Sequence, residues 1–338
     1  MFLFLEKKKL IEKFNKKWAN RELYFCPSIY GELNLAYSKI RACCMCTMAP
    51  FTPPIFYMDK DNNYNALNLK EYFRQLDRIM TWNQTEKAVC SGCNFFKKMV
   101  VPPIEAEGNI KLLSINNFTI CNSDCIYCSC TVKEYDNSYP LIPIFKRFLK
   151  YGLINENTLI NWGGGEPVIC SEFDKCASFF INKKIKQNIN SSGIKFSKFI
   201  LEGMKNDLIS VQISPDAGTP ETYKAIKRQN GFDKVWENIE KYAKYPDKLV
   251  VKYIIFSMNS NENDIRKFIE KCINAKIKKI VIDSEHYSSN GENSPFGKIG
   301  EQELNMAILL KKLAIENNIE YSISHQWIPA HREIIENA

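Results

Sequence analysis

The sequence has 338 residues, of which 45% are apolar, and it carries a formal net charge of +8. That length suits two domains better than one, and the apolar content is sufficient for a buried core. The basic residues are spread along the chain without a dense stripe or a nucleic-acid-binding module, so we expect a solvated surface and no nucleic-acid partner.

Neither a secretory signal nor a membrane span is predicted. The opening MFLFLEKKKL has too few apolar residues before its charges, and no later segment approaches the roughly 18 to 20 apolar residues of a spanning helix. We therefore expect a cytoplasmic protein. In a reducing compartment the thirteen cysteines favour metal binding over a disulfide framework.

The first predicted element is an amphipathic helix with Leu10, Ile11, Phe14 and Trp18 on one face. We expect this face to pack on the protein itself, with weak membrane-surface contact as the alternative. Residues 1–108 show no steady alternation of strand and helix signals, which favours a small domain that bound metal stabilises. Six cysteines lie in this segment: Cys26, Cys43, Cys44, Cys46, Cys90 and Cys93.

Residues 109–338 alternate β-type runs with segments of helical period, as parallel βα units do. Six such units are too few for the usual eight-stranded barrel, so the predicted fold is α/β with a partial barrel. Thr219 and Pro220 are typical of a helix start. The predicted strands span 111–116, 158–162, 185–190, 208–214, 249–256 and 277–283. The predicted buried helix stripes are Phe232, Val235, Trp236, Ile239 and Tyr242, and Ile265, Phe268, Ile269, Cys272 and Ile273.

Three cysteines follow the first of these strands in the stretch CNSDCIYC, at Cys121, Cys125 and Cys128. Thiolates suit iron–sulfur clusters and zinc, and structural sites of both kinds normally take four protein ligands. Three cysteines leave one metal position open, in a loop expected at the face where such folds build active sites. A zinc site that borrows Cys130 is the alternative.

A glycine-rich turn, NWGGGEP, follows the second predicted strand. Its glycines allow the backbone to approach a ligand closely, and the Glu166 carboxylate can accept a charge-assisted hydrogen bond from an ammonium group. A glycine-rich turn alone is a weak signal. One strand after a three-cysteine loop, it indicates a ligand site.

These two motifs resemble those of the radical S-adenosylmethionine (SAM) enzymes, a CxxxCxxC loop and a GGE(P) segment in a partial (β/α)6 barrel. The resemblance implies that Cys121, Cys125 and Cys128 hold a [4Fe–4S] cluster whose open iron binds SAM. It implies that Gly164, Gly165 and Glu166 bind the methionine amino group and that Tyr127 lies near the adenine. An electron from the reduced cluster would then release a 5′-deoxyadenosyl radical that abstracts hydrogen from a substrate.

The resemblance extends downstream and covers roughly residues 110–300. INSSG resembles the family's ribose-contacting turn, which makes Ser191 and Ser192 candidates for cofactor binding. SPDAGTPETYKAIK resembles the segment after the fourth strand, where Ser214 and Asp216 would face the pocket. Lys252 and Asn259 are weaker candidates near the fifth strand.

The N-terminal cysteines resemble the SPASM or twitch arrangement, in which four cysteines hold an auxiliary [4Fe–4S] cluster. The implied ligands are Cys26, Cys43, Cys90 and Cys93, although Cys44 or Cys46 could replace Cys43 and zinc could use the same residues. That module generally follows the barrel, whereas here it precedes it. A cluster with four cysteine ligands favours electron transfer over substrate binding.

The resemblance implies an enzyme with an unidentified substrate and an electron donor such as flavodoxin or ferredoxin. The first hundred residues form the cysteine module, which leaves no obvious separate domain to bind the leader peptide of a precursor. We therefore expect modification of a small molecule such as a sugar or metabolite. Peptide or protein modification is the alternative, and a non-catalytic iron–sulfur electron carrier is a third. Cys130 and Cys170 could reach the pocket, whereas Cys176 and Cys272 are expected to be buried. His286 is a minor candidate for the active-site face.

Overall fold

The computed structural model describes residues 2–36, 39–43, 55–57, 67–91, 93, 95–105, 110–128, 136, 139–285 and 298–338. The chain divides into two compact units. Unit 1 contains Met1–Ile120, Glu134–Gly165 and Cys170–Asn188, and unit 2 contains Cys121–Lys133, Glu166–Ile169 and Ile189–Ala338. The proposed domains 1–108 and 109–338 remain a prediction from the sequence.

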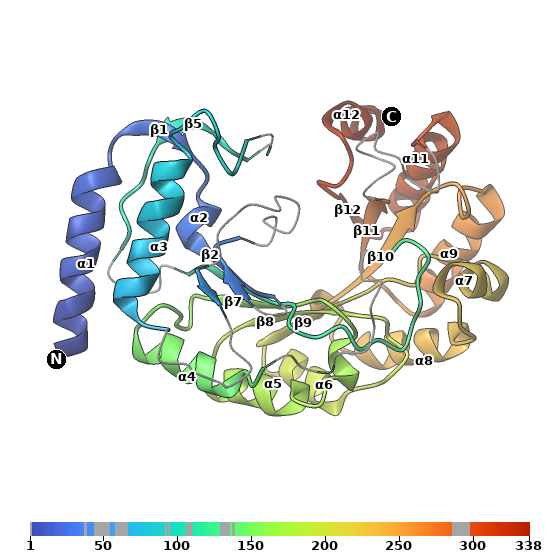
Figure 1. The fold of residues 1–338 in the computed structure, drawn as a ribbon. Coiled ribbons are helices and arrows are strands. Elements are labelled where there is room, and N and C mark those ends of the chain that lie inside the picture. The colour runs from blue at the N-terminus through green and yellow to red at the C-terminus, as the bar shows by residue number, and fades with distance from the viewer. Residues whose placement is uncertain are drawn as a thin grey trace. The chain divides into compact units, whose positions relative to one another are not determined.

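Helices and strands alternate along most of the described chain (Figure 1). The helices are α1 (Phe2–Trp18), α2 (Ser28–Gly31), α3 (Leu69–Trp82), α4 (Ile142–Lys150), α5 (Phe173–Asn182), α6 (Lys198–Lys205), α7 (Pro220–Lys227), α8 (Phe232–Tyr242), α9 (Glu262–Asn274), α11 (Glu301–Glu316) and α12 (Pro329–Asn337). The strands are β1 (Glu22–Phe25), β2 (Glu32–Ala36), β3 (Lys39–Arg41), β4 (Phe56–Tyr57), β5 (Lys97–Val100), β6 (Leu112–Ile115), β7 (Leu159–Trp162), β8 (Gln187–Ser191), β9 (Ile209–Ile213), β10 (Leu249–Ile255), β11 (Lys279–Ser284) and β12 (Glu320–Ile323).

Helices α1 and α3 of unit 1 pack side by side (Figure 1). The predicted apolar face of α1 is buried at Ile11, Phe14 and Trp18. The Phe14 ring meets the Phe73 ring of α3 edge-on, with 6.0 Å between centroids, and the Trp18 indole N–H donates to Asp77 at 2.7 Å. This confirms that the face packs on the protein's own body.

Strands β2, β6 and β7 of unit 1 are parallel neighbours, and β3 and β4 extend the sheet beyond β2 in antiparallel pairing. The register aligns Leu33, Leu113 and Ile160, which are all buried on one face. Trp162, two residues beyond Ile160 on the same face, packs against Phe173 of α5 with 5.1 Å between ring centroids. The sequence did not predict that the N-terminal segment adds β2 directly to β6.

Strands β9 to β12 of unit 2 run parallel in sequence order. Helices α8 and α9 bury their predicted stripes, and Trp236 packs against Phe268 with 6.0 Å between ring centroids. The prediction is wrong for Ile273, which is 45% exposed. Ile273 lies at the edge of the stripe of α9, because each residue turns the helix by about 100°.

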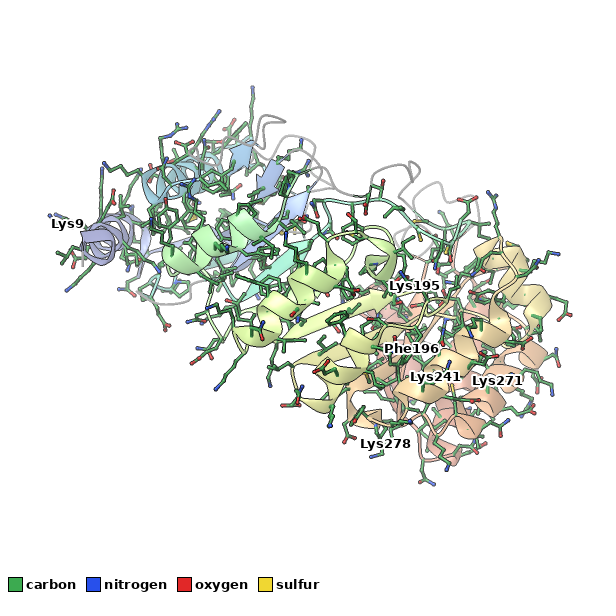
Figure 2. The ribbon with its side chains drawn as sticks, turned by 90° about the horizontal axis from the view of Figure 1, so that it is seen from below. Lys9, Lys195, Phe196, Lys241, Lys271 and Lys278 are labelled. Atoms are coloured by element: carbon green, nitrogen blue, oxygen red, sulfur yellow. The ribbon has the colours of Figure 1, made fainter. Side chains whose placement is uncertain are left out.

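Lysine side chains lie over aromatic rings of unit 2, and the pair of Lys241 and Phe196 is labelled in Figure 2. The Lys241 ammonium lies 5.4 Å from the centre of the Phe196 ring, and that of Lys271 lies 5.3 Å from the Phe232 ring. Such side chains shield apolar surface with their stems while the charge stays in water. Lysines arranged in this way account for part of the basic surface.

All six predicted strands are present, as β6 to β11, with ends that differ by at most two residues from the prediction. Strand β8 lies at the division between the units, and β12 follows as a further parallel strand. The chain therefore has the predicted α/β fold with a large parallel sheet. None of the helices in the described ranges has the length and apolar character needed to cross a membrane.

Asp264 ties the first turn of α9 to the segment before α7 and to β10. Its buried carboxylate accepts from the Gly218 and Thr219 N–H groups at 2.8 and 3.1 Å and from the Tyr253 hydroxyl at 2.5 Å. Removal of this carboxylate leaves buried donors unsatisfied. We expect Asp264→Ala to lower the free energy of unfolding in urea by about 3 kcal/mol.

The matched control is Glu262→Ala, which removes an exposed carboxylate from the same helical turn. Glu262 forms a surface ion pair with Arg266, and its side chain is 60% exposed. We expect its free energy of unfolding to change by less than about 0.5 kcal/mol. Equal losses in the two variants would contradict the role of Asp264.

Candidate functional site

The three closely spaced cysteines lie in a loop that follows β6. Cys121, Cys125 and Cys128 are half-buried members of unit 2. The Cys128 N–H donates to the Cys125 carbonyl at 3.0 Å, so these two residues share one tight turn. None of the ten cysteines in the described chain forms a disulfide, which leaves these three side chains as thiols.

The C-terminal end of α7 holds this cysteine loop. The Asp124 N–H donates to the Lys227 carbonyl at 3.1 Å, and the Ile126 N–H donates to the Ile226 carbonyl at 3.0 Å. Carbonyls in the last turn of a helix lack partners within the helix, and here the loop supplies donors. Arg228, which caps the helix in the left-handed conformation, adds an exposed ion pair to Asp124 at 3.2 Å.

Two predicted cofactor residues, Tyr127 and Asp216, meet in a buried triad with Lys227. The Tyr127 hydroxyl donates to Asp216 Oδ2 at 2.5 Å, and the Lys227 ammonium lies 2.5 Å from both that oxygen and the hydroxyl. The second Asp216 oxygen accepts from the Ile254 N–H at 2.8 Å. Asp216 is fully buried, so its carboxylate is engaged within the protein.

Glu166 is buried together with Ser191 and Ser192. Its carboxylate accepts from the Ser191 hydroxyl at 2.9 Å, the Ser192 N–H at 2.5 Å and the Val168 N–H at 3.2 Å. Burial raises the pKa of Glu166, and these hydrogen bonds only partly counter it. A cation beside the carboxylate would favour its charged form, so the site suits an ammonium group.

The turn of Ser191 and Ser192 also contacts the cysteine loop. The Ser192 hydroxyl donates to Asn122 Oδ1 at 3.0 Å. Asn122 directly follows Cys121, so a hydrogen-bonded path within unit 2 joins Glu166 to the loop through the serine turn.

The glycines that precede Glu166 belong to unit 1 and pack tightly against a neighbouring backbone. A Cβ at Gly165 would lie 2.0 Å from the Ile120 carbonyl oxygen, and one at Gly164 would lie 2.6 Å from the Phe118 carbonyl oxygen. Gly164 also has φ of +85°, which side chains disfavour. Only glycine therefore fits these two positions without displacing the 118–120 backbone.

The weaker candidates of unit 2 are engaged within the protein. Lys252 forms an ion pair with Asp283 at 3.1 Å. The fully buried Asn259 amide donates to the carbonyls of Asp216 and Ile254 at 2.9 and 2.7 Å. Ser214 is half-buried directly after β9.

Three of the predicted N-terminal ligands lie near one another in unit 1. Burial raises the pKa of the Cys26 and Cys90 thiols, and the charge of Cys93 raises both further. Cys90 accepts from the Asn83 amide at 3.3 Å, and Cys43 is half-buried after β3. In the ranges that the structure describes, no three His, Cys, Asp or Glu side chains form a group that could hold a single metal ion.

Several candidates lie outside the described residues, namely Cys44, Cys46, Cys130 and His286. Of the remaining cysteines, Cys176 and Cys272 are fully buried as predicted, and Cys170 is buried with 4% exposure.

Sequence reasoning missed Asn122 and Lys227. Both stand inside quoted motifs, but neither residue type is diagnostic there. What marks Lys227 is the burial of its ammonium group. This burial arises only when α7 packs against the cysteine loop, so the sequence does not reveal it.

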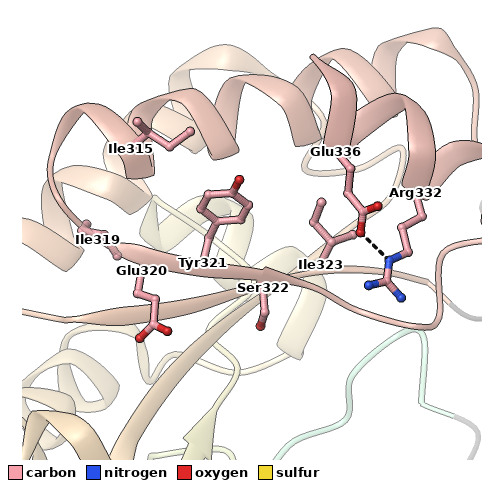
Figure 3. Close-up of a pocket in the computed structure, with 8 residues that line it drawn as sticks. All are labelled: Ile315, Ile319, Glu320, Tyr321, Ser322, Ile323, Arg332 and Glu336. Carbon is pink, nitrogen blue, oxygen red and sulfur yellow. Dashed lines mark hydrogen bonds and ion pairs between the residues drawn. The ribbon is translucent and has the colours of Figure 1, made fainter.

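An open pocket of about 530 Å³ lies elsewhere in unit 2, between β12, α11 and α12 (Figure 3). Tyr321 and Ile323 point toward the helices, whereas Glu320 and Ser322 point to the other side of the strand (Figure 3). Arg332 pairs with Glu336 at its edge at 2.7 Å. Since none of the predicted site residues lines it, this pocket is separate from the cysteine loop.

A family profile matches residues 115–272, and its description is the Radical SAM superfamily. The matched segment contains both the cysteine loop and the glycine-rich turn.

Curated relatives include a GTP 3′,8-cyclase of Clostridium botulinum (strain Okra / Type B1), 28% identical over 169 residues that cover 47% of this chain and 52% of the relative. Another is the molybdenum cofactor biosynthesis protein moc-5 of Caenorhabditis elegans, 25% identical over 158 residues that cover 44% of this chain and 26% of the relative. The match thus spans about half the length of the cyclase.

Solved structures share the fold at low identity. Streptococcus suis SuiB bound to precursor peptide SuiA aligns with a TM-score of 0.52 and 14% identity, over 77% of this chain and 55% of that one. Native anSMEcpe with bound AdoMet and the Cp18Cys peptide aligns with a TM-score of 0.50 and 16% identity, over 63% and 62%.

Proposed function

This chain belongs to the radical SAM superfamily through residues 115–272, and on that premise we propose that it is an enzyme that cleaves S-adenosylmethionine reductively. The observation that carries the proposal is the buried carboxylate of Glu166, which a serine turn joins to the three-cysteine loop within unit 2. A protein that only carries electrons has no use for such an ammonium-binding group.

The thiols of Cys121, Cys125 and Cys128 fit a [4Fe–4S] cluster, because they are soft donors, form no disulfide and lie in one supported loop. When bound, such a cluster would supply one electron to SAM, and the 5′-deoxyadenosyl radical released would take hydrogen from a substrate. The backbone hydrogen bonds between the loop and the end of α7 would hold the three cysteines in place to bind the cluster.

Residues of this chain would bind and orient SAM. We propose that Glu166 accepts from its ammonium group and that Gly164 and Gly165 allow close backbone approach. Ser191 and Ser192 hold the Glu166 carboxylate in place through hydrogen bonds. The further proposed cofactor residues are Tyr127, Ser214 and Asp216.

We propose that Cys26, Cys43, Cys90 and Cys93, within an N-terminal domain of residues 1–108, hold an auxiliary [4Fe–4S] cluster that relays electrons. Burial and, to a smaller extent, the charge of Cys93 raise the pKa of Cys26 and of Cys90, which supports this grouping. The electron donor would be a flavodoxin or a ferredoxin. None of the cysteines in the described ranges forms a disulfide, which fits the reducing cytoplasm that we propose for this protein.

Iron counting tests the auxiliary cluster. After anaerobic reconstitution we expect about eight irons per chain, falling to about four in a Cys26→Ala/Cys90→Ala/Cys93→Ala variant, because each site would hold four. That variant should still form 5′-deoxyadenosine from SAM and dithionite. About four irons together with zinc in the unaltered chain would contradict a second cluster.

The substrate we propose is a small molecule. The curated relative at 28% identity is named for GTP, a nucleotide, whereas the peptide-bound neighbours SuiB and anSMEcpe share the fold at only 14% and 16% identity. Peptide or protein modification is the second candidate. A non-catalytic electron carrier would bind iron without forming 5′-deoxyadenosine.

A further inference from the structure

The buried ammonium of Lys227 belongs to the triad with Tyr127 and Asp216, but the proposed binding of the cluster and SAM does not use its charge. Its side chain is only 6% exposed, and Asp216 is its paired carboxylate. That carboxylate also serves the Tyr127 hydroxyl and the Ile254 N–H. A buried charge is costly unless it is well compensated, so a lysine at this position needs an explanation.

The Lys227 ammonium lies beside the cysteine loop, because it donates to the hydroxyl of Tyr127 at 2.5 Å. Burial lowers the pKa of Lys227, but the neighbouring charge of Asp216 raises it, and the net direction is upward. The side chain therefore stays positively charged. The ammonium also lies 5.0 Å from the centre of the Tyr127 ring, between two of the cysteines in sequence.

The backbone of α7 couples the position of this charge to that of the loop. The carbonyls of Ile226 and Lys227 itself accept the loop's hydrogen bonds from Ile126 and Asp124. These bonds do not involve the side chain, so a substitution at Lys227 can remove the charge while the backbone support stays.

We propose that the buried positive charge of Lys227 raises the reduction potential of the cluster held by Cys121, Cys125 and Cys128. This inference rests on the proposed function. One electron from an external reductant adds one negative charge to the cluster, and no proton moves. A fixed positive charge nearby stabilises the reduced state, since net charge is among the factors that set such potentials.

The test is a potentiometric titration of the reconstituted full chain, followed by electron paramagnetic resonance. The signal absent from a Cys121→Ala variant identifies the relevant cluster. For Lys227→Met we expect the equilibrium constant of reduction to fall about tenfold, a shift of about 59 mV for a one-electron couple. Lys227→Arg should restore the potential, because it keeps the charge.

Arg228→Met is the matched control. Arg228 is the next residue, and its side chain, which pairs with Asp124, is 60% exposed. Solvent screens such a charge. In Arg228→Met, the equilibrium constant for reduction of the cluster should therefore stay within about twofold of its value in the unaltered chain. The same shift in both variants, or no shift in a fully loaded Lys227→Met protein, overturns the proposal.

Iron content covers the case in which Lys227→Met takes up no cluster. If Lys227→Met and Lys227→Gln both fail to load while Lys227→Arg loads, the positive charge is needed for cluster assembly rather than for its potential, and the proposal is overturned. If all three fail, Lys227 serves folding alone and the proposal is overturned. Equal iron in the unaltered chain and Cys121→Ala would instead refute the proposed function itself, which is visible before any Lys227 variant is made.

Discussion

Replacement of Cys121, Cys125 and Cys128 by alanine should remove about four irons per chain and abolish 5′-deoxyadenosine formation, because no other thiols lie in this loop's described residues to ligate the cluster. The measurements are iron analysis after anaerobic reconstitution and chromatography of the nucleoside after incubation with SAM and dithionite. Loss of the product should exceed a hundredfold, since reduction of SAM would have no route.

A buried cysteine from α9 provides the control. Cys272 is fully buried, and burial raises its thiol pKa, as expected for a residue that only packs. We expect Cys272→Ala to keep its iron and its product while losing on the order of 1 kcal/mol of stability. Persistent 5′-deoxyadenosine in the triple variant would refute the ligand assignment.

A Glu166→Gln variant should bind SAM about tenfold to a hundredfold more weakly, because charge-assisted hydrogen bonds contribute about 1.5–3 kcal/mol. Three donors converge on this carboxylate from Ser191, Ser192 and Val168. A side-chain amide is uncharged and has only one acceptor oxygen, so it binds an ammonium more weakly and cannot accept from all three donors. Equilibrium dialysis of the reconstituted protein measures the affinity.

Glu172→Gln is the matched control. Glu172 also accepts from a backbone N–H, that of Leu141 at 3.0 Å, but it lies in unit 1 at the start of α5. Its variant should bind SAM with unchanged affinity. Equal losses in the two variants would point to a general effect on folding and would refute a direct role of Glu166.

Lys227 and Arg228 are adjacent in sequence but differ in the burial of their charges. The two residues share one helix end, yet one charge is buried against the cysteine loop and the other faces solvent. Because the electrostatic effect of a charge grows as water is excluded, the buried lysine has the larger influence on the loop. Comparison of the two variants therefore isolates burial from charge.

Local patterns in the sequence determined much of the fold and the main candidates. Strands β6 to β11 followed from short apolar runs, and the stripes of α8 and α9 from a 3.6-residue period, because both depend on neighbours along the chain. The cysteine triplet and Glu166 were visible for the same reason. Their chemistry depends on residue type and close spacing.

Only the tertiary structure decided how distant segments meet. The pairing of β2 with β6, the triad of Tyr127, Asp216 and Lys227, and the contact of Ser192 with Asn122 all join residues far apart in sequence. Ile273 was misplaced because its exposure depends on which helix face a neighbouring element covers. Such contacts arise from packing over long sequence separations, which local periodicity does not record.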